Sequence, residues 1–298
     1  MKITLLCVFY FSVISLAQAQ FTKIYPVQSA QFFRNYNLIN PASHGLYNTM
    51  EINPGFLSHL GPFKEIKSYF ISGSFQINPR ITSNRPRQVV GIILLTDKRG
   101  ELINRTRAYI SYAVHIKLSE QYSLSAGTSV GLASFTFSGT SANSSGSDTK
   151  PDGNFGLWLY KEGFNFGISI NQMFNTKLQP IREEFQLTRH FNINAEKKFD
   201  LSPVVQLMPI ALIRYPGLNH VDIDIATLCT IQNILSFGGN FRKDRGIAFM
   251  LGLDKIPLSS SDFSMMFSYQ IPSGKTRNSN IQIMELTLRL SMERKDKS

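Results

Sequence analysis

The chain has 298 residues, of which 43% are hydrophobic and 17% are charged, and it carries a formal net charge of +11. Its 23 Phe and 11 Tyr residues exclude a disordered chain, because disordered chains combine high net charge with few residues available for burial. The charged fraction is below the roughly one quarter that is usual in soluble domains. The low charged fraction argues against an ordinary cytosolic enzyme, whose surface carries more charged residues.

The N-terminus has the pattern of a secretory signal peptide. Lys2 gives a positive start, residues 3–16 are almost continuously apolar, and Ala17 and Ala19 stand where a signal peptidase reads small side chains. A buried N-terminal helix or strand is the less favoured interpretation. We predict a signal peptide over residues 1–19 and a mature chain that begins at Gln20. That chain has one cysteine, Cys229, and therefore no intramolecular disulfide.

Strict alternation of apolar and polar residues predicts β-strands along the mature chain. It is clearest from Arg105 to Leu118, where Ile110 and Val114 belong to an apolar face and Arg107 and His115 to a polar one. No stretch prefers a helical period. Further alternating segments lie at residues 122–134, 164–171, 221–226, 235–241, 247–253, 263–269 and 284–290.

The spacing of these segments predicts a single all-β domain over residues 46–292. It corresponds to about 14 strands, within a range of about 12 to about 16. Turn-forming residues separate the strands at positions 97–100, 161–163, 243–246 and 272–275. Residues 138–153, rich in Ser and Gly, are predicted to be the longest polar loop, and residues 293–298 a short tail.

Alternation alone does not distinguish a soluble β-protein from a membrane barrel. The export signal, strands of about ten residues and aromatic residues near strand ends, such as Tyr160, Phe199 and Tyr269, all favour a barrel. In lipid, a chain of strands satisfies its backbone hydrogen bonds only as a closed barrel. We therefore expect a transmembrane antiparallel β-barrel in an outer membrane, with a secreted all-β domain as the alternative.

Several short motifs, in order, resemble the PorP/SprF family of outer-membrane proteins, which belong to the type IX secretion system of Bacteroidetes. Residues 29–35 are followed by a segment with Asn40-Pro41-Ala42 and Gly45, similar to the family's opening. Residues 53–56 lack the Arg-Gln-Trp motif of many members, and Leu290 replaces a final aromatic residue. The residues matched to family motifs, as structural or partner contacts, are Asn40, Pro41, Ala42, Gly45, Gly91, Asp97, Gly100, Tyr112, Pro203 and Asp222.

This resemblance implies a non-enzymatic protein of the outer membrane of a Gram-negative bacterium. Such a protein supports export or surface anchoring of cargo proteins with gliding-type C-terminal signals. The implied partners are secreted cargo or a surface adhesin, a periplasmic peptidoglycan-associated linker, the motor ring and outer-membrane lipid. Residues 20–45 would lie at the periplasmic side, before the first strand. Nucleic acid is not expected as a partner, because the chain is exported and has no long basic segment.

Two other functions remain as alternatives: a porin or small-solute channel, and, less favoured, an outer-membrane enzyme. His115 and Ser111 share one strand face but lie about 13 Å apart at about 3.3 Å per residue, so they do not form a catalytic pair. Asp222 and Asp224 are expected to pair with lumen arginines such as Arg242 or Arg289 rather than to bind a cation. We therefore assign no catalytic, cofactor-binding or metal-binding residue.

Overall fold

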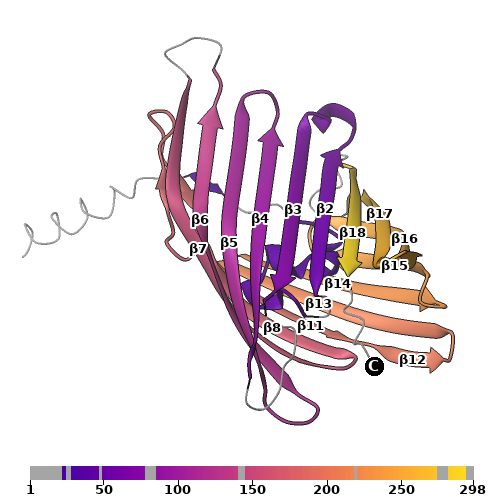
Figure 1. The fold of residues 1–298 in the computed structure, drawn as a ribbon. Coiled ribbons are helices and arrows are strands. Elements are labelled where there is room, and N and C mark those ends of the chain that lie inside the picture. The colour runs from indigo at the N-terminus through magenta and orange to yellow at the C-terminus, as the bar shows by residue number, and fades with distance from the viewer. Residues whose placement is uncertain are drawn as a thin grey trace, which may run out of the picture.

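The structure, a computed structural model, describes residues 22–24, 28–46, 49–77, 85–139, 145–217, 220–273 and 281–292. The predicted signal peptide with Ala17 and Ala19, and the predicted tail 293–298, lie outside these residues. Over the described residues, 14 antiparallel strands close into one β-barrel, which confirms the predicted fold (Figure 1). No helix in the described ranges has the length and apolar character needed to cross a membrane.

Each barrel strand pairs with its neighbours in the chain, and the circle closes where the last strand pairs with the first. The barrel strands are β2 (Met50–His59), β3 (Ile66–Gln76), β4 (Arg87–Arg99), β5 (Ile103–Lys117), β6 (Ser123–Phe137), β7 (Gly146–Lys161), β8 (Phe164–Asn171), β11 (His190–Lys197), β13 (Val205–Gly217), β14 (His220–Ile231), β15 (Leu235–Arg242), β16 (Gly246–Leu258), β17 (Ser261–Ile271) and β18 (Ile283–Met292). The short β12 (Phe199–Ser202) pairs with the start of β13.

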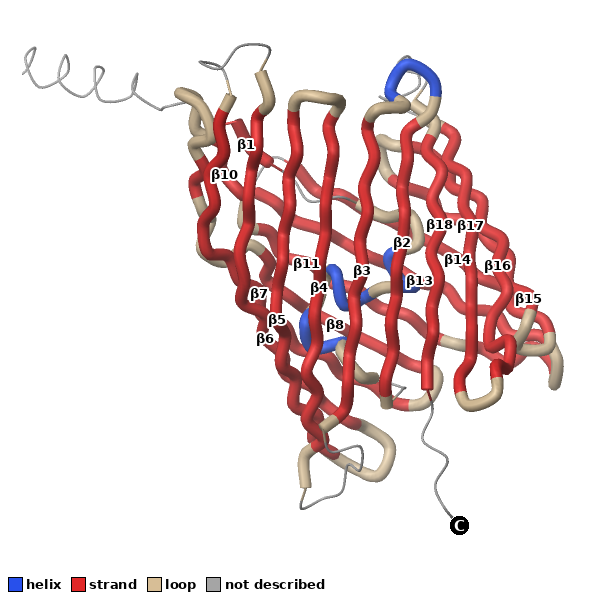
Figure 2. The backbone as a smooth tube through the Cα atoms, turned by 45° about the horizontal axis from the view of Figure 1, so that its top comes forward, coloured by secondary structure: helices blue, strands red, loops and turns tan. Residues whose placement is uncertain are grey.

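The two ends of the barrel differ. We call the end that holds the start of β2 and the end of β18 the terminal mouth, and the opposite end the loop mouth. The loop mouth carries the connections 60–65, 138–145 and 172–189, and the first of these contains the 3₁₀ helix η4 (Gly61–Phe63). In Figure 2 the loop mouth is at the top and the chain leaves β18 at the bottom.

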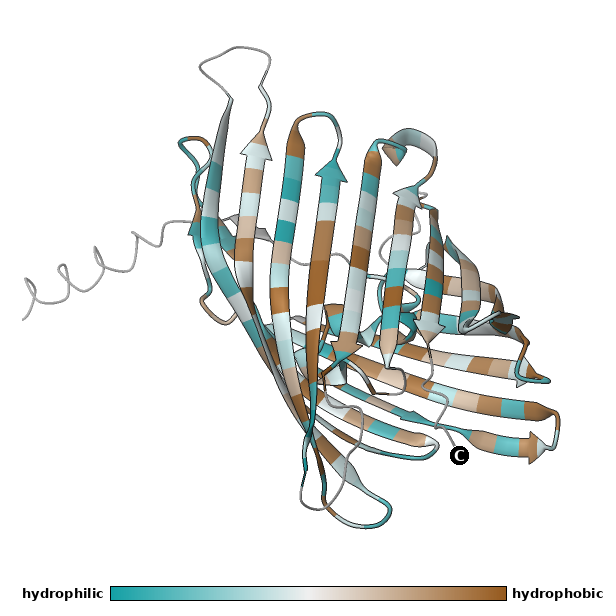
Figure 3. Cartoon of the chain, in the orientation of Figure 1, coloured by the Kyte–Doolittle hydropathy of each residue, from teal (hydrophilic) through white to brown (hydrophobic). Residues whose placement is uncertain are grey.

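The predicted alternation holds in detail. In β5, Ile110 is 69% exposed on the outer surface, whereas Ser111 and Ala113 are buried towards the lumen. The outer positions of other strands are likewise exposed and apolar, and Figure 3 shows the hydrophobic colour along them. Some lumen-facing positions, such as Ile93 of β4 and Ile210 of β13, are apolar as well. An apolar outer surface is what a barrel in lipid requires.

The prediction of a loop over residues 138–153 is wrong for its second half. Strand β7 begins at Gly146, so that only residues 138–145 connect it to β6. Pairing continues because polar side chains match across the strands: Thr149 donates to Ser134 at 2.9 Å, and Thr136 and Ser147 hydroxyls lie 3.1 Å apart. The chain extends the hairpin beyond the rest of the barrel.

A small sheet lies at the loop mouth. It contains β1 (Thr22–Ile24), β9 (Lys177–Leu178) and β10 (Phe185–Leu187), with β1 parallel to β10 (Figure 2). The ring of Phe185 stacks on Phe135 of β6 at a centroid distance of 4.5 Å. The connection between β8 and β11 is therefore folded against the wall.

Residues 28–46 lie inside the barrel, and we call them the plug. They form three 3₁₀ helices, η1 (Phe32–Arg34), η2 (Tyr36–Leu38) and η3 (Pro41–Ser43), drawn in blue within the barrel in Figure 2. The family resemblance leads us to expect residues 20–45 at the periplasmic side, before the first strand. The lumen holds the plug instead, because its aromatic side chains are buried there against apolar residues of the wall.

Candidate functional site in the barrel lumen

The plug runs through the lumen from one mouth to the other. At the loop mouth, the Gln28 side chain donates to Asp222 Oδ2 at 2.9 Å, and Arg242 donates to the Gln28 carbonyl at 2.9 Å. At the terminal mouth, Arg87 donates to the Leu46 carbonyl at 3.4 Å. The chain therefore crosses the barrel before it enters β2.

Glu285 on β18 anchors the loop-mouth half of the plug. Its carboxylate accepts hydrogen bonds from the Ala30 N–H at 2.8 Å, from the Gln31 N–H at 3.4 Å and from the Ser29 hydroxyl. The Gln31 amide in turn donates to Ser268 at 3.0 Å. Glu285 is 1% exposed, so these donors supply the compensation that a buried carboxylate requires.

The two aspartates of β14 at the loop mouth are paired with arginines. Asp224 accepts from Arg214 at 3.0 Å and from Arg242 at 3.4 Å. Asp222, a predicted motif residue, forms an ion pair with Arg245 at 2.9 Å. The predicted pairing of Asp224 with Arg242 is confirmed.

The other predicted arginine has a different role. Arg289 of β18 donates to Asn53 Oδ1 at 2.9 Å and to the carbonyl of Arg34 in the plug. Arg34 itself forms an ion pair with Asp254 of β16. Arg289 therefore binds the plug rather than the aspartates of β14.

An apolar cluster joins the plug to one side of the lumen. Tyr36 lies edge-on to Trp158, the only tryptophan of the chain, with ring centroids 4.8 Å apart. The Tyr36 hydroxyl donates to Glu196 at 2.5 Å. The other cluster members are Phe32, Phe33, Ala42, Leu46, Ile210, Leu212, Ala226, Leu228, Met250 and Met266.

The terminal half of the plug contains the predicted Asn40-Pro41-Ala42 motif. The Asn40 side chain accepts from the Ala42 N–H at 2.9 Å, which caps η3. Its amide donates to the carbonyls of Leu157 at 3.1 Å and Ile168 at 3.0 Å. One side chain therefore shapes the turn and fixes it to β7 and β8.

A row of small residues gives the plug backbone room to approach the wall. Ala113, Gly127 and Gly156 are partners in register across β5, β6 and β7. A Cβ atom on Gly127 would lie 2.6 Å from backbone atoms of Pro41 and Ala42. Gly127 is therefore a position of close packing between the wall and the plug.

Gly91 and Gly45, both predicted motif residues, meet the wall nearby. A Cβ atom on Gly91 would lie 2.4 Å from the ring of His44. Gly45 has a φ of +67°, which favours glycine, and accepts at its carbonyl from Gln76 at 3.0 Å. His44 is thereby enclosed completely.

His115 of β5 contacts the backbone of the terminal half of the plug. One ring nitrogen lies 2.9 Å from the His44 carbonyl, and the other lies 3.0 Å from the Tyr160 hydroxyl and 3.2 Å from Arg87. Over the described residues, the Ser111 hydroxyl has no hydrogen-bond partner. The contacts of His115 thus hold the backbone and form no catalytic arrangement with Ser111.

The remaining motif residues lie away from the plug. Asp97 is buried and forms ion pairs with Arg99 at 3.0 Å and Arg105 at 3.1 Å. Gly100 lies in a turn and has a φ of +75°. Tyr112 lies on the outer surface, and Pro203 lies in the turn before β13. Sequence reasoning missed Glu285 and Trp158 as plug contacts; their lumen-facing positions in alternating strands were the available signal.

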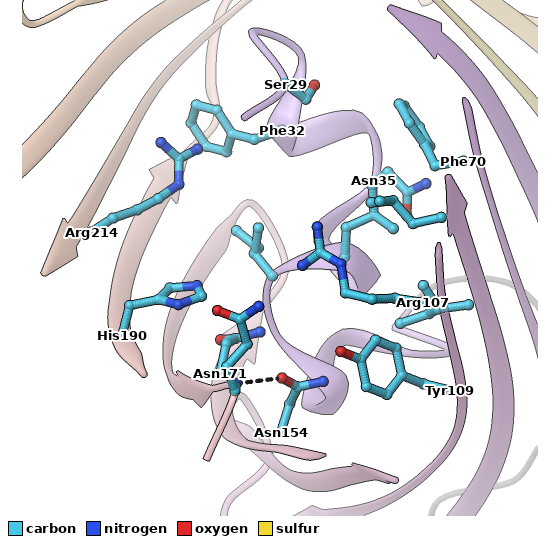
Figure 4. Close-up of a pocket in the computed structure, with 15 residues that line it drawn as sticks. Ser29, Phe32, Asn35, Phe70, Arg107, Tyr109, Asn154, Asn171, His190 and Arg214 are labelled. Atoms are coloured by element: carbon cyan, nitrogen blue, oxygen red, sulfur yellow. Dashed lines mark hydrogen bonds between the residues drawn. The ribbon is translucent and has the colours of Figure 1, made fainter. Parts of the chain in front are cut away.

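Opposite faces of the plug line two cavities. A vestibule of about 700 Å³ at the terminal mouth is lined by Phe33, Arg34 and Tyr36 together with strand ends. A smaller cavity of about 50 Å³ lies on the other face, where Phe32 and Asn35 contribute to the lining (Figure 4). In the described ranges, no three His, Cys, Asp or Glu residues are grouped to hold a metal ion.

Comparison with known proteins identifies the family and the fold. The family model for "Type IX secretion system membrane protein PorP/SprF" matches residues 21–290. No curated protein sequence matches. Among solved structures, the Pseudomonas putida toluene transporter TodX has a TM-score of 0.51 at 8% identity, covering 92% of this chain and 95% of that one.

Two further solved structures are similar. A Pseudomonas aeruginosa FadL homologue has a TM-score of 0.51 at 8% identity, covering 85% of this chain and 92% of that one. The CymD monoaromatic hydrocarbon channel has a TM-score of 0.51 at 9% identity, covering 89% and 94%. At these identities the likeness concerns the barrel fold.

Proposed function

Because this chain belongs to the PorP/SprF family of type IX secretion system membrane proteins and lies in the outer membrane, we propose that it is a non-enzymatic accessory of secretion. In this role it supports the export or the surface anchoring of cargo proteins with gliding-type C-terminal signals. It also connects the outer membrane to a periplasmic peptidoglycan-associated linker and, through it, to the motor ring.

The plug is the observation that carries this proposal. A diffusion channel needs an open lumen, whereas in this barrel hydrogen bonds join the plug to strands on several sides of the lumen. Asn240 of β15 donates to the Ala30 carbonyl at 2.8 Å, Ser72 of β3 donates to Asn35 at 2.7 Å, and Ser169 of β8 donates to the Ile39 carbonyl at 2.6 Å. A barrel whose lumen is filled in this way is better suited to binding other proteins than to conducting solutes.

The lengths of the connections between strands indicate which mouth of the barrel faces the cell surface. Outer-membrane barrels have short periplasmic turns and longer extracellular loops. The connection β7–β8 has two residues, Glu162 and Gly163, whereas β8 and β11 are joined through residues 172–189. We therefore place the loop mouth at the cell surface, where cargo binds, and the terminal mouth in the periplasm, where the linker binds.

A channel is the second candidate, because the titles of the similar structures describe TodX as a toluene transporter and CymD as a hydrocarbon channel. In this function the plug would have to move aside for solute to pass. The extensive contacts of the plug favour the accessory role.

Cargo capture tests the proposal. The purified full-length protein is immobilised and offered a fluorescent protein that carries a gliding-type C-terminal signal, with the same protein without the signal as the control. We expect retention only of the signal-bearing form. A variant lacking residues 140–143 in the β6–β7 connection tests the surface placement, since loss of retention is expected. Equal retention of both fluorescent proteins, or of neither, contradicts the proposed function.

A further inference from the structure

The smaller cavity, on the loop-mouth face of the plug, has the composition of a ligand site. Its wall contributes Arg107 from β5, Tyr109 from the same strand, Asn171 from β8 and Gln172 directly after it. Figure 4 shows Arg107, Asn171 and His190 turned towards the same space. None of these residues holds the plug through a hydrogen bond described above.

Gln172 is the clearest sign of a missing partner. Its side chain is 1% exposed, and over the described residues neither its amide oxygen nor its amide nitrogen has a hydrogen-bond partner. Leaving both atoms of a buried amide unpaired is costly, and buried polar groups are normally satisfied. Its backbone φ of 54° lies in the left-handed region, which non-glycine residues seldom adopt. The residue is thus held in a costly position beside the cavity.

Arg107 supplies a positive charge to the same space. It is 8% exposed, and it forms a hydrogen bond with the Tyr109 side chain. The Tyr109 hydroxyl donates to Asp152 at 2.7 Å, and the Asp152 carboxylate attracts the guanidinium without forming one of the ion pairs found among the described residues. Asp152 also accepts from the Gly153 N–H at 2.8 Å, so its oxygens are occupied by other donors. Most of the five guanidinium N–H groups remain available to a ligand.

The other polar groups add donors. The Asn171 oxygen already accepts from Ser169 at 3.0 Å and Asn192 at 2.8 Å, so this side chain offers only its amide N–H groups to the cavity. A small acceptor with two oxygens could accept hydrogen bonds from Arg107, Asn171 and the amide nitrogen of Gln172. The Gln172 amide oxygen is itself an acceptor and is not satisfied by such a ligand. Arginine binds carboxylates in this way, through two parallel hydrogen bonds.

The apolar part of the lining comes partly from the plug. It consists of Phe32, Leu38, Ile39, Phe70, Ile93 and Leu95, and the polar residues Ser29, Asn35, Asn154, His190 and Arg214 complete the lining. A volume of about 50 Å³ is roughly one third of the 150 Å³ of an engineered cavity that binds benzene. The space therefore suits a short alkyl group and excludes a long chain.

From these observations we propose that the cavity binds a small monocarboxylate of about one to three carbons. Arg107 and Gln172 hold its carboxylate, and its alkyl group lies against Phe32 and Leu38 of the plug. The bound acid lies between the wall and the plug and therefore adds to the contacts that keep the plug in place. The proposal is independent of the cargo-binding role.

Saturation-transfer NMR on the full-length protein in a neutral detergent tests this site. Sodium formate, acetate, propionate and hexanoate are titrated at constant ionic strength. We expect saturable binding of the first three and at least an approximately tenfold weaker signal for hexanoate, whose chain exceeds the cavity. Absence of saturable acetate binding, or equal binding of hexanoate, overturns the proposal, and so does displacement of acetate by equimolar chloride.

Variants locate the binding. Arg107→Met and Gln172→Leu are each expected to weaken acetate binding by about tenfold or more. Arg182→Met removes the same charge from an exposed position near the loop mouth and is expected to leave binding unchanged. Faster migration of unheated samples on denaturing gels identifies folded barrel for every variant. Folded Arg107→Met with wild-type acetate affinity contradicts the site, and the ligand series on the wild-type protein tests it without any variant.

Discussion

The two halves of the plug are held in different ways. Residues 28–36 are fixed by side chains, through the buried carboxylate of Glu285 and the aromatic contact of Tyr36 with Trp158. Residues 39–46 are fixed by the Asn40 side chain and, in addition, by the close approach of the backbone to small residues such as Gly127. A side-chain contact loses part of its energy when one group is changed, whereas a backbone contact across a glycine has no spare room. The terminal half is therefore the less tolerant of the two.

Gly127→Val is expected to have the largest effect. The new side chain meets the backbone of Pro41 and Ala42, so the terminal half of the plug is displaced and the barrel loses about 3 kcal/mol of stability, the upper end for an overpacked site. The temperature at which the folded band disappears on denaturing gels measures this loss. Gly239→Val is the matched control, because a Cβ atom on Gly239 in β15 meets only the Ala248 carbonyl oxygen, at 3.7 Å. Equal transitions for the two variants contradict the backbone contact.

Glu285→Gln is expected to have a smaller effect. The amide keeps the volume of the side chain but accepts fewer hydrogen bonds from Ser29, Ala30 and Gln31, and hydrogen bonds to charged groups contribute about 1.5–3 kcal/mol. The same gel transition measures the loss. Glu120→Gln, at an exposed turn position, is the control and should leave the transition unchanged. If the folded band of Glu285→Gln disappears at the same temperature as that of the wild-type protein, this carboxylate does not hold the plug.

The double variant Gly127→Val with Glu285→Gln sharpens the comparison. If the two halves are held independently, the two losses of stability add to within about 0.5 kcal/mol, as is usual for separated sites. If the plug leaves the lumen as one unit, the second substitution costs little once the first is present. We expect additivity, because Gly127 and Glu285 contact different residues of the plug, and a marked deficit in the double variant contradicts the division into halves.

The smallest perturbation is a short tag at each end of the mature chain. Since Thr22–Ile24 of β1 lies at the loop mouth and Met292 ends β18 at the terminal mouth, tags fused beyond these two elements are expected at opposite mouths. Protease added to intact cells is expected to remove the N-terminal tag and to leave the C-terminal one. Removal of both tags, or of the C-terminal tag alone, contradicts this placement, and lysed cells serve as the control for access.

The sequence could predict the wall of the barrel but not the position of the plug. Alternation in β5 was sufficient to assign Ile110 to the outer surface and His115 to the lumen, because side chains of a strand alternate between its two faces. The plug has short 3₁₀ turns with no such period. Its contacts, such as that of Ala30 with Glu285, join residues at opposite ends of the chain, and nothing local encodes them. The pairing of residues 146–153 with β6 was missed because Ser and Gly obscured the alternation.

Single-channel recording of the purified full-length protein in planar bilayers tests the central claim, a lumen occupied by its own N-terminal segment. A plugged lumen predicts a closed baseline for the wild-type protein and the appearance of openings in Gly127→Val, with Gly239→Val as closed as the wild type. A steady, large conductance of the wild-type protein would contradict a plugged barrel.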